Sequence, residues 1–98
     1  MKISSNFNRF YWKVFIADIK QNLKELRWNN IDLNITRLNE QGVHDLLKIV
    51  TFHNKSLTEM ENKEVVEFLE DIRVLLSDNG YTLQIDNEEW ERIIKEIR

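Results

Sequence analysis

The sequence predicts a mostly helical α+β fold, and three observations support this prediction. First, 98 residues with 42% hydrophobic and 32% charged side chains suit one small globular core, so we expect a single domain over residues 1–98. Second, four segments repeat apolar residues at helical spacing. Third, segments 31–36 and 81–86 alternate apolar with polar residues, as half-buried strands do. The predicted order is α-β-α-α-β-α; the alternative is a plain four-helix bundle in which both alternating segments are loops.

The first helix is predicted to begin after the capping cluster Ser4, Ser5 and Asn6 and to reach about Trp28. Its core stripe steps by four and three residues alternately, which keeps the side chains on one face of an α-helix: Trp12, Ile16, Ile19, Leu23 and Leu26. The pair Asn29-Asn30 is expected to end it.

A second apolar side marks the start of this helix. On an α-helical wheel four residues point well away from the first stripe: Phe7, Phe10, Tyr11 and Val14. We expect the last helix or the strand pair to cover this side, as a helix inside a small domain requires. The alternatives are a homodimer or partner interface, and then a helix lying on a membrane surface.

The two alternating segments are expected to pair with each other. Ile31, Leu33 and Ile35 alternate with polar residues, and Tyr81, Leu83 and Ile85 repeat the pattern. Neither segment has an obvious hairpin arm nearby. Because two strands alone are marginally stable, helices must cover the predicted pair.

Three further helices follow from spacing and caps. The second runs from Asn39 to about Asn54 with Val43, Leu46, Leu47 and Val50 inside. The third opens with Thr58 and Glu61 in capping-box spacing, ends at Asn79-Gly80, and buries Val65, Phe68, Leu69, Ile72, Leu75 and Leu76. The fourth begins at Asp86 and buries Trp90, Ile93, Ile94 and Ile97.

Composition and motifs argue against catalysis. The absence of cysteine excludes disulfides, thiolate zinc sites and cysteine nucleophiles. His44 and His53 are nine residues apart, too far out of phase on one helix to share a metal, and we expect a surface position for His44 and a helix-end position for His53. The longest apolar run near the start is residues 14–17, too short for a signal peptide or a membrane span. We expect a cytoplasmic protein that is not an enzyme and has no cofactor or metal.

Charge is sorted along the chain. Residues 1–56 hold nine Lys/Arg against five Asp/Glu, whereas residues 57–98 hold five against twelve. Such segregation places fields of opposite sign on different elements, which governs association with partners more than it governs fold.

The acidic half predicts a partner-binding face on the third helix. Carboxylates and two apolar residues lie away from its core stripe: Met60, Glu64, Glu67, Glu70, Asp71, Val74 and Asp78, with Glu70 at the margin. Carboxylates would steer a basic partner, while Met60 and Val74 would supply desolvated contact. The leading hypothesis is therefore a small binding protein, such as an inhibitor or immunity-type antagonist, that docks this face on a basic site of a larger protein.

The basic half supports an alternative. Five cations share one edge of the first helix on an α-helical wheel: Arg9, Lys13, Lys20, Lys24 and Arg27. With Phe10 and Trp28 alongside, such a stripe could bind phosphates and stack bases in a small nucleic-acid-binding regulator. It could equally be a solvated flank, and the net charge of −3 opposes nucleic acid.

Overall fold

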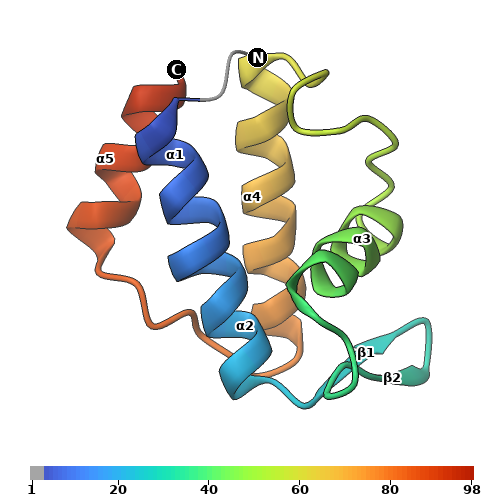
Figure 1. Cartoon of the computed structure of the whole chain (residues 1–98). Coiled ribbons are helices and arrows are strands. Elements are labelled where there is room, and N and C mark those ends of the chain that lie inside the picture. Colours follow the sequence, from blue (N-terminus) through green and yellow to red (C-terminus); the bar gives the residue numbers. More distant parts are fainter. Residues whose placement is uncertain (1–3) are drawn as a thin grey trace.

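The computed structural model describes residues 4–98 and confirms a mostly helical α+β fold (Figure 1). Four helical rods surround one buried cluster, and a short hairpin lies beside the C-terminal end of α4. The elements in chain order are α1 (Ser5–Arg9), the π-helix η1 (Phe10–Ile16), α2 (Ala17–Asn22), β1 (Glu25–Trp28), β2 (Ile31–Asn34), α3 (Glu40–Val50), α4 (Asn62–Asp78) and α5 (Asn87–Ile97).

The first rod is one continuous helix whose middle is wound as a π-helix. Backbone angles stay helical across both junctions, at Arg9 and at Ile16. A π turn bonds i to i+5 and holds more residues than an α turn, so residues five apart come to lie on the same side. The buried pairs Phe10-Tyr11 and Phe15-Ile16 are spaced in this way. The two apolar sides seen in the sequence therefore merge into one buried face.

This winding leaves little of Phe7, Phe10 and Tyr11 exposed for the alternative of a homodimer interface. Phe7, Phe10 and Tyr11 are at most 4% exposed, and Val14 is half-buried. Their rings pack inside the molecule, where Tyr11 lies between Phe7 and Phe15 at centroid distances of 6.0 and 5.7 Å. As expected, the last helix covers part of this side, because Phe10 and Val14 line a hollow together with Ile93 of α5. The π winding turns Phe7 and Tyr11 toward the core.

The predicted end of the first helix is also wrong. The helix stops at Asn22, where Leu23 turns to extended angles (φ −105°, ψ 122°). Residues 25–28, expected to be helical, form β1 and pair antiparallel with β2, with Leu26 opposite Leu33 and Trp28 opposite Ile31. Asn29 and Asn30 have φ of 50° and 63°, the left-handed pair that a two-residue hairpin turn needs and that asparagine tolerates. They connect two strands instead of ending a helix.

The predicted pairing of 31–36 with 81–86 is therefore wrong, because the partner of 31–34 is the adjacent strand. Segment 81–86 forms no strand and bends at Gln84, and a side chain of α2 holds it. Asp18 accepts a hydrogen bond from the Tyr81 hydroxyl at 2.5 Å and another from the Gln84 backbone N–H at 2.6 Å. Burial, followed by the bond to Asp18, raises the pKa of Tyr81 to about 12.

Replacing Asp18 by alanine is expected to loosen this segment. Hydrogen bonds to a charged acceptor contribute more than neutral ones, and the Gln84 amide loses its partner, so the free energy of unfolding should fall by about 1 to 3 kcal/mol. Urea denaturation measures the loss, and amide exchange should accelerate at Gln84. Glu91→Ala, an exposed carboxylate on α5, is the control. Equal stability and equal exchange in both variants would contradict the tether.

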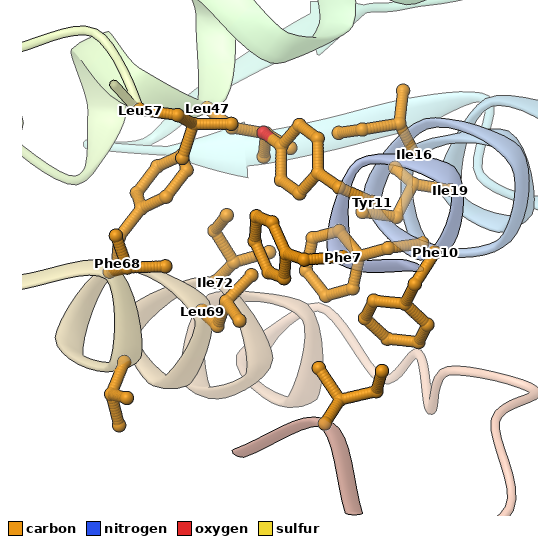
Figure 2. Close-up of a cluster of buried hydrophobic side chains, with 14 of the residues drawn as sticks. Phe7, Phe10, Tyr11, Ile16, Ile19, Leu47, Leu57, Phe68, Leu69 and Ile72 are labelled. Atoms are coloured by element: carbon orange, nitrogen blue, oxygen red, sulfur yellow. The ribbon is translucent and has the colours of Figure 1, made fainter. Parts of the chain in front are cut away.

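The helical cores of α4 and α5 confirm the sequence prediction. Val65, Phe68, Leu69, Ile72 and Leu76 on α4 are buried, as are Trp90, Ile93, Ile94 and Ile97 on α5. Figure 2 shows Phe68, Leu69 and Ile72 of α4 facing the first rod, where Tyr11, Phe7 and Ile19 lie. Leu47 and Leu57 belong to the same cluster. Phe15 stacks on Trp90 at 6.0 Å, which joins the first rod to α5.

His44 lies in this core, so its predicted surface position is wrong. It is 6% exposed, and its Nδ1 lies 2.5 Å from the Tyr11 hydroxyl. Burial raises the pKa of Tyr11 far above its usual range and lowers the pKa of His44. The phenol therefore donates to a neutral imidazole, which carries its proton on Nε2. The pair satisfies two buried polar groups and has a structural role.

Candidate protein-binding site

One side of α4 carries a row of carboxylates, which we call the acidic strip. Its members alternate steps of three and four residues and so share one side of the helix, away from the buried stripe of Val65, Phe68 and Ile72. They are Glu64, Glu67, Asp71, Val74 and Asp78. Glu64 is half-buried, the other four are exposed, and Val74 is 61% exposed. An apolar side chain is thus open to solvent within a row of carboxylates.

Two predicted members of this surface lie elsewhere. Met60 is fully buried, because α4 begins at Asn62 rather than near Thr58 and the preceding turn points inward. Its predicted exposure is wrong. Glu70 lies on the α5 side, where it accepts a hydrogen bond from Trp90 Nε1 at 3.3 Å. Arg73 covers the same indole ring at 4.6 Å from its centroid. Glu70 therefore belongs to the contact between α4 and α5.

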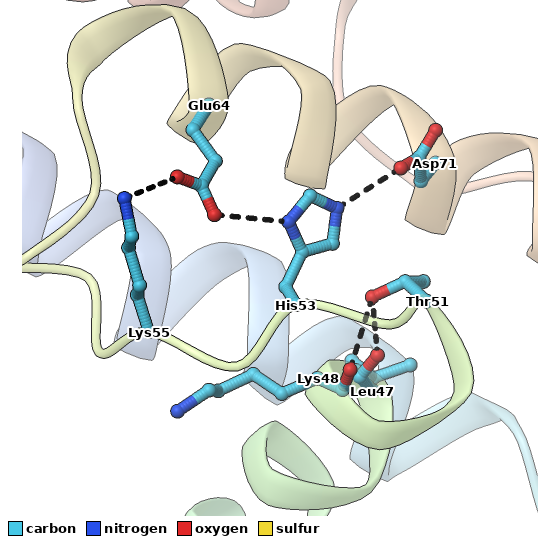
Figure 3. Close-up of polar contacts among 7 residues, drawn as sticks. All are labelled: Leu47, Lys48, Thr51, His53, Lys55, Glu64 and Asp71. Atoms are coloured by element: carbon cyan, nitrogen blue, oxygen red, sulfur yellow. Dashed lines mark hydrogen bonds and ion pairs between the residues drawn. The ribbon is translucent and has the colours of Figure 1, made fainter.

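The inner edge of the acidic strip is fixed by His53 (Figure 3). Its Nδ1 lies 3.5 Å from a Glu64 carboxylate oxygen, and its Nε2 lies 3.0 Å from one of Asp71. Lys55 also pairs with Glu64, at 3.5 Å. These contacts hold the α3–α4 connection against α4. Within residues 4–98, Glu67 and Asp78 have no ion pair, so the outer edge of the strip keeps its charge available.

Asp78 occupies a position that is unfavourable for the helix itself. It is the last residue of α4, and the last turn contains no basic residue. The C-terminal end of a helix carries partial negative charge, so a carboxylate there is repelled and a cation is attracted. A basic group supplied from outside the chain would therefore stabilise this end of α4.

The five-cation stripe predicted on the first helix is broken in the structure. Arg9, Lys13 and Lys20 are exposed on the rod, but the π segment between them shifts their α-helical phase. Lys24 lies in the bend after α2, and Arg27 lies on β1, where it pairs with Asp32 at 3.5 Å. The cations are thus spread over three elements, and their predicted single helical edge is wrong.

An exposed apolar patch, which the sequence analysis missed, borders the acidic strip. It consists of Trp28, Ile31, Ile49 and Phe52. Phe52 is 78% exposed, and its ring lies 6.2 Å from that of half-buried Trp28. The sequence signal was the chain position of Phe52, directly after α3, where a helix commonly places glycine.

Among residues 4–98, no three His, Asp or Glu side chains are placed to hold a metal ion. None of the helices in that part of the chain combines the length and apolar character needed to cross a bilayer. One hollow lies between the first rod and α5, and charges of both signs line it, among them Arg9, Glu89, Arg92 and Glu96.

Comparison with known proteins gives no family. The chain matches no protein-family model, no curated protein sequence and no solved structure. Function is therefore argued from the surfaces alone, and the acidic strip with its neighbouring apolar patch is the best-defined of them.

Proposed function

We propose that this chain is a small protein-binding protein that docks the acidic strip of α4 on a basic site of a larger protein. The observation that supports this most directly is the outer edge of the strip. Glu67 and Asp78 are exposed without an ion pair in the described chain, and exposed Val74 lies between them. Carboxylates around an exposed apolar side chain are typical of a docking surface, whereas a helix face that only meets solvent is wholly polar.

Electrostatics gives such a surface its selectivity. Carboxylates on one side of a rigid helix accelerate encounter with a cationic site and penalise acidic partners. Val74 adds apolar surface that is removed from water when the partner binds, and this burial stabilises the complex after the first encounter. Because α4 is anchored through six buried residues, the strip is presented without reorganisation.

This geometry supports an antagonist role. A basic site on a larger protein commonly binds phosphate or another anion, and a carboxylate-rich helix presents a similar field. Occupying that site would block its usual ligand. We therefore propose an inhibitor or immunity-type function, exerted by binding and without catalysis.

The test is a tagged pull-down from a lysate of the cells that express the protein, with and without nuclease. The double variant Glu67→Lys/Asp78→Lys is compared with Glu91→Lys/Glu96→Lys, which makes the same charge change at exposed positions of α5. We expect the first variant to lose the stoichiometric partner by a factor of about ten or more, because like charges then face each other. The second should retain it.

Two outcomes would contradict the proposal. If both variants retained the partner equally, the acidic strip would not be the docking surface. If the captured material disappeared on nuclease treatment, the interaction would run through nucleic acid, and the exposed cations Arg9, Lys13 and Lys20 would become the site to test.

A further inference from the structure

Two helices of this chain end in the same hydrogen-bonded turn. At the end of α4, the Gly80 N–H bonds to the Ser77 carbonyl, and the Tyr81 N–H bonds to the Leu76 carbonyl, both at 2.9 Å. At the end of α3, the Phe52 N–H bonds to the Ile49 carbonyl at 3.2 Å, and the His53 N–H bonds to the Lys48 carbonyl at 2.9 Å. Both are Schellman motifs, in which one residue must take left-handed angles.

The residue in the left-handed position differs between the two turns. At the end of α4 it is Gly80, with φ of 73°; at the end of α3 it is Phe52, with φ of 60°. Glycine takes this conformation without cost, whereas a bulky side chain is strained there. The turn after α4, which has the expected glycine, can therefore be compared directly with the turn after α3. Phe52 departs from the local rule that Gly80 follows.

The fold gains little core burial from this strained residue. Phe52 is 78% exposed, so its ring adds almost nothing to the hydrophobic core. Within residues 4–98 its one contact with another aromatic ring is with Trp28, at 6.2 Å, and Trp28 is itself half-buried. A conformationally costly aromatic that faces solvent is a reason to look for function, because strain persists where it serves something other than the fold.

The hairpin extends the same apolar surface. Leu26, Trp28, Ile31 and Leu33 lie on one face of the two strands, because alternate residues share a face and paired residues lie opposite each other. Exposure increases toward the turn, from 1% at Leu26 to 55% at Ile31. The inner half of this face is covered by the core, and the outer half remains open beside Phe52.

Two contacts fix the apolar patch against the acidic strip. His53, the neighbour of Phe52, bonds to Asp71 at 3.0 Å. Arg27, the neighbour of Trp28, donates its backbone N–H to the Asn79 side chain at 2.7 Å, one residue after Asp78. The residues next to Phe52 and Trp28 thus contact α4 at Asp71 and Asn79, which places the Trp28–Phe52 pair close to that stretch of α4.

We infer that the apolar patch is the anchoring half of the docking surface, and that its partner is a protein segment presenting an apolar side chain flanked by lysine or arginine. This inference rests on the proposed function and specifies what the partner must offer. The apolar side chain would pack on Phe52 and Trp28, and the cations would reach Asp71 and Asp78 of the acidic strip.

The surrounding charge argues against two other occupants. A second copy of the chain, docked symmetrically, would bring two acidic strips together, and like charges repel. An anionic membrane would be repelled by the same carboxylates. A cationic protein segment is the occupant whose charge complements Asp71 and Asp78.

The probe for this inference is a synthetic amphipathic helix with leucine on one face and lysine on the other. A peptide with every lysine replaced by glutamate is the control. Binding is followed by two-dimensional amide NMR, in which the Trp28 indole N–H should move. The buried Trp90 indole, which is bonded to Glu70, serves as an internal reference. We expect shifts at Ile31, Ile49, Phe52 and the acidic strip with the lysine peptide only.

Phe52→Gly separates binding from folding. It restores the residue found in the matching turn of α4, so the melting temperature should stay level or rise, whereas affinity for the lysine peptide should fall by about tenfold or more. Gly80→Ala, in the other turn, is the matched control. It strains the same kind of left-handed position where nothing lies within 4 Å of the new methyl group, so it should lower the melting temperature and leave binding intact.

The remaining outcomes distinguish a failure of this inference from a failure of the proposed function. Binding that survives Phe52→Gly but is lost in Glu67→Lys/Asp78→Lys would overturn this inference and leave the proposed function standing. Binding lost in Phe52→Gly but kept in the charge variant would overturn the cationic partner and the acidic docking site together. A drop in melting temperature for Phe52→Gly, equal binding of the glutamate peptide, self-association through the patch, or preferential binding to anionic vesicles would each overturn the inference.

Discussion

Replacing Phe10 by alanine is expected to lower the free energy of unfolding by about 3 to 5 kcal/mol, the usual cost of truncating a fully buried phenylalanine. Phe10 is 4% exposed and packs 6.2 Å from the ring of Phe15. On an uninterrupted α-helix its side chain would point about 120° away from that of Ile16, outside the stripe that Ile16 and Ile19 share. A large loss therefore tests the π winding of η1 as well as the burial.

Phe52→Ala is the matched control, because it removes the same atoms from a side chain that is 78% exposed. It should change stability by less than about 1 kcal/mol, since little apolar area leaves or enters water. Chemical denaturation of both variants gives the comparison directly. A small loss at Phe10, comparable to that at Phe52, would mean that the first rod is wound as a plain α-helix.

The elements that sequence predicted best are those in which local and tertiary signals agree. In α4 the apolar spacing and the closing Gly80, and in α5 the apolar spacing and the opening Asp86, indicate the same helices. Their predicted core residues are buried, except for half-buried Leu75. Asp86 caps α5 by accepting from the Glu88 N–H at 3.0 Å. Such signals lie within one or two turns of chain, which is why a single sequence was enough.

The first rod and the hairpin failed for a different reason. An α-helical wheel assumes a constant angle per residue, so a π segment appears in the sequence as two apolar sides instead of one. Asn29-Asn30 can end a helix or turn a hairpin, because asparagine tolerates left-handed angles in either case. Residues 25–28 then continued a heptad by coincidence. Only the pairing with β2 decides between the two structures, and pairing is not a local property.

The sequence predicted one of the two parts of the candidate site, the acidic strip, and not the apolar patch. The acidic strip follows from helical periodicity and was identified, apart from Met60 and Glu70, whose surroundings are set by tertiary packing. The apolar patch combines side chains from β1, β2 and α3, so no periodicity within one element reveals it. The available clue was the absence of glycine after α3, which becomes informative once the hydrogen bonds of that turn are known.

Acidification below pH 6.5 is expected to destabilise this protein through His44. Burial lowers the pKa of His44 in the folded state, so in the unfolded state, where it titrates near 6.5, the imidazole takes up a proton first. Stability is fully present above that pH and falls as pH decreases toward the folded-state value. For a single group the slope cannot exceed about 1.4 kcal/mol per pH unit. Urea denaturation at pH 7.5, 6.5 and 5.5 measures it.

His44→Asn isolates this contribution. Its amide oxygen can accept from the Tyr11 hydroxyl in place of Nδ1, yet it does not titrate, so the variant should lose less stability than the wild type over the same pH range. His53 is present in both proteins, and its effect cancels in the difference. Equal pH dependence in the two proteins would show that the buried imidazole accepts a proton without cost, contrary to its position between Tyr11 and Phe68.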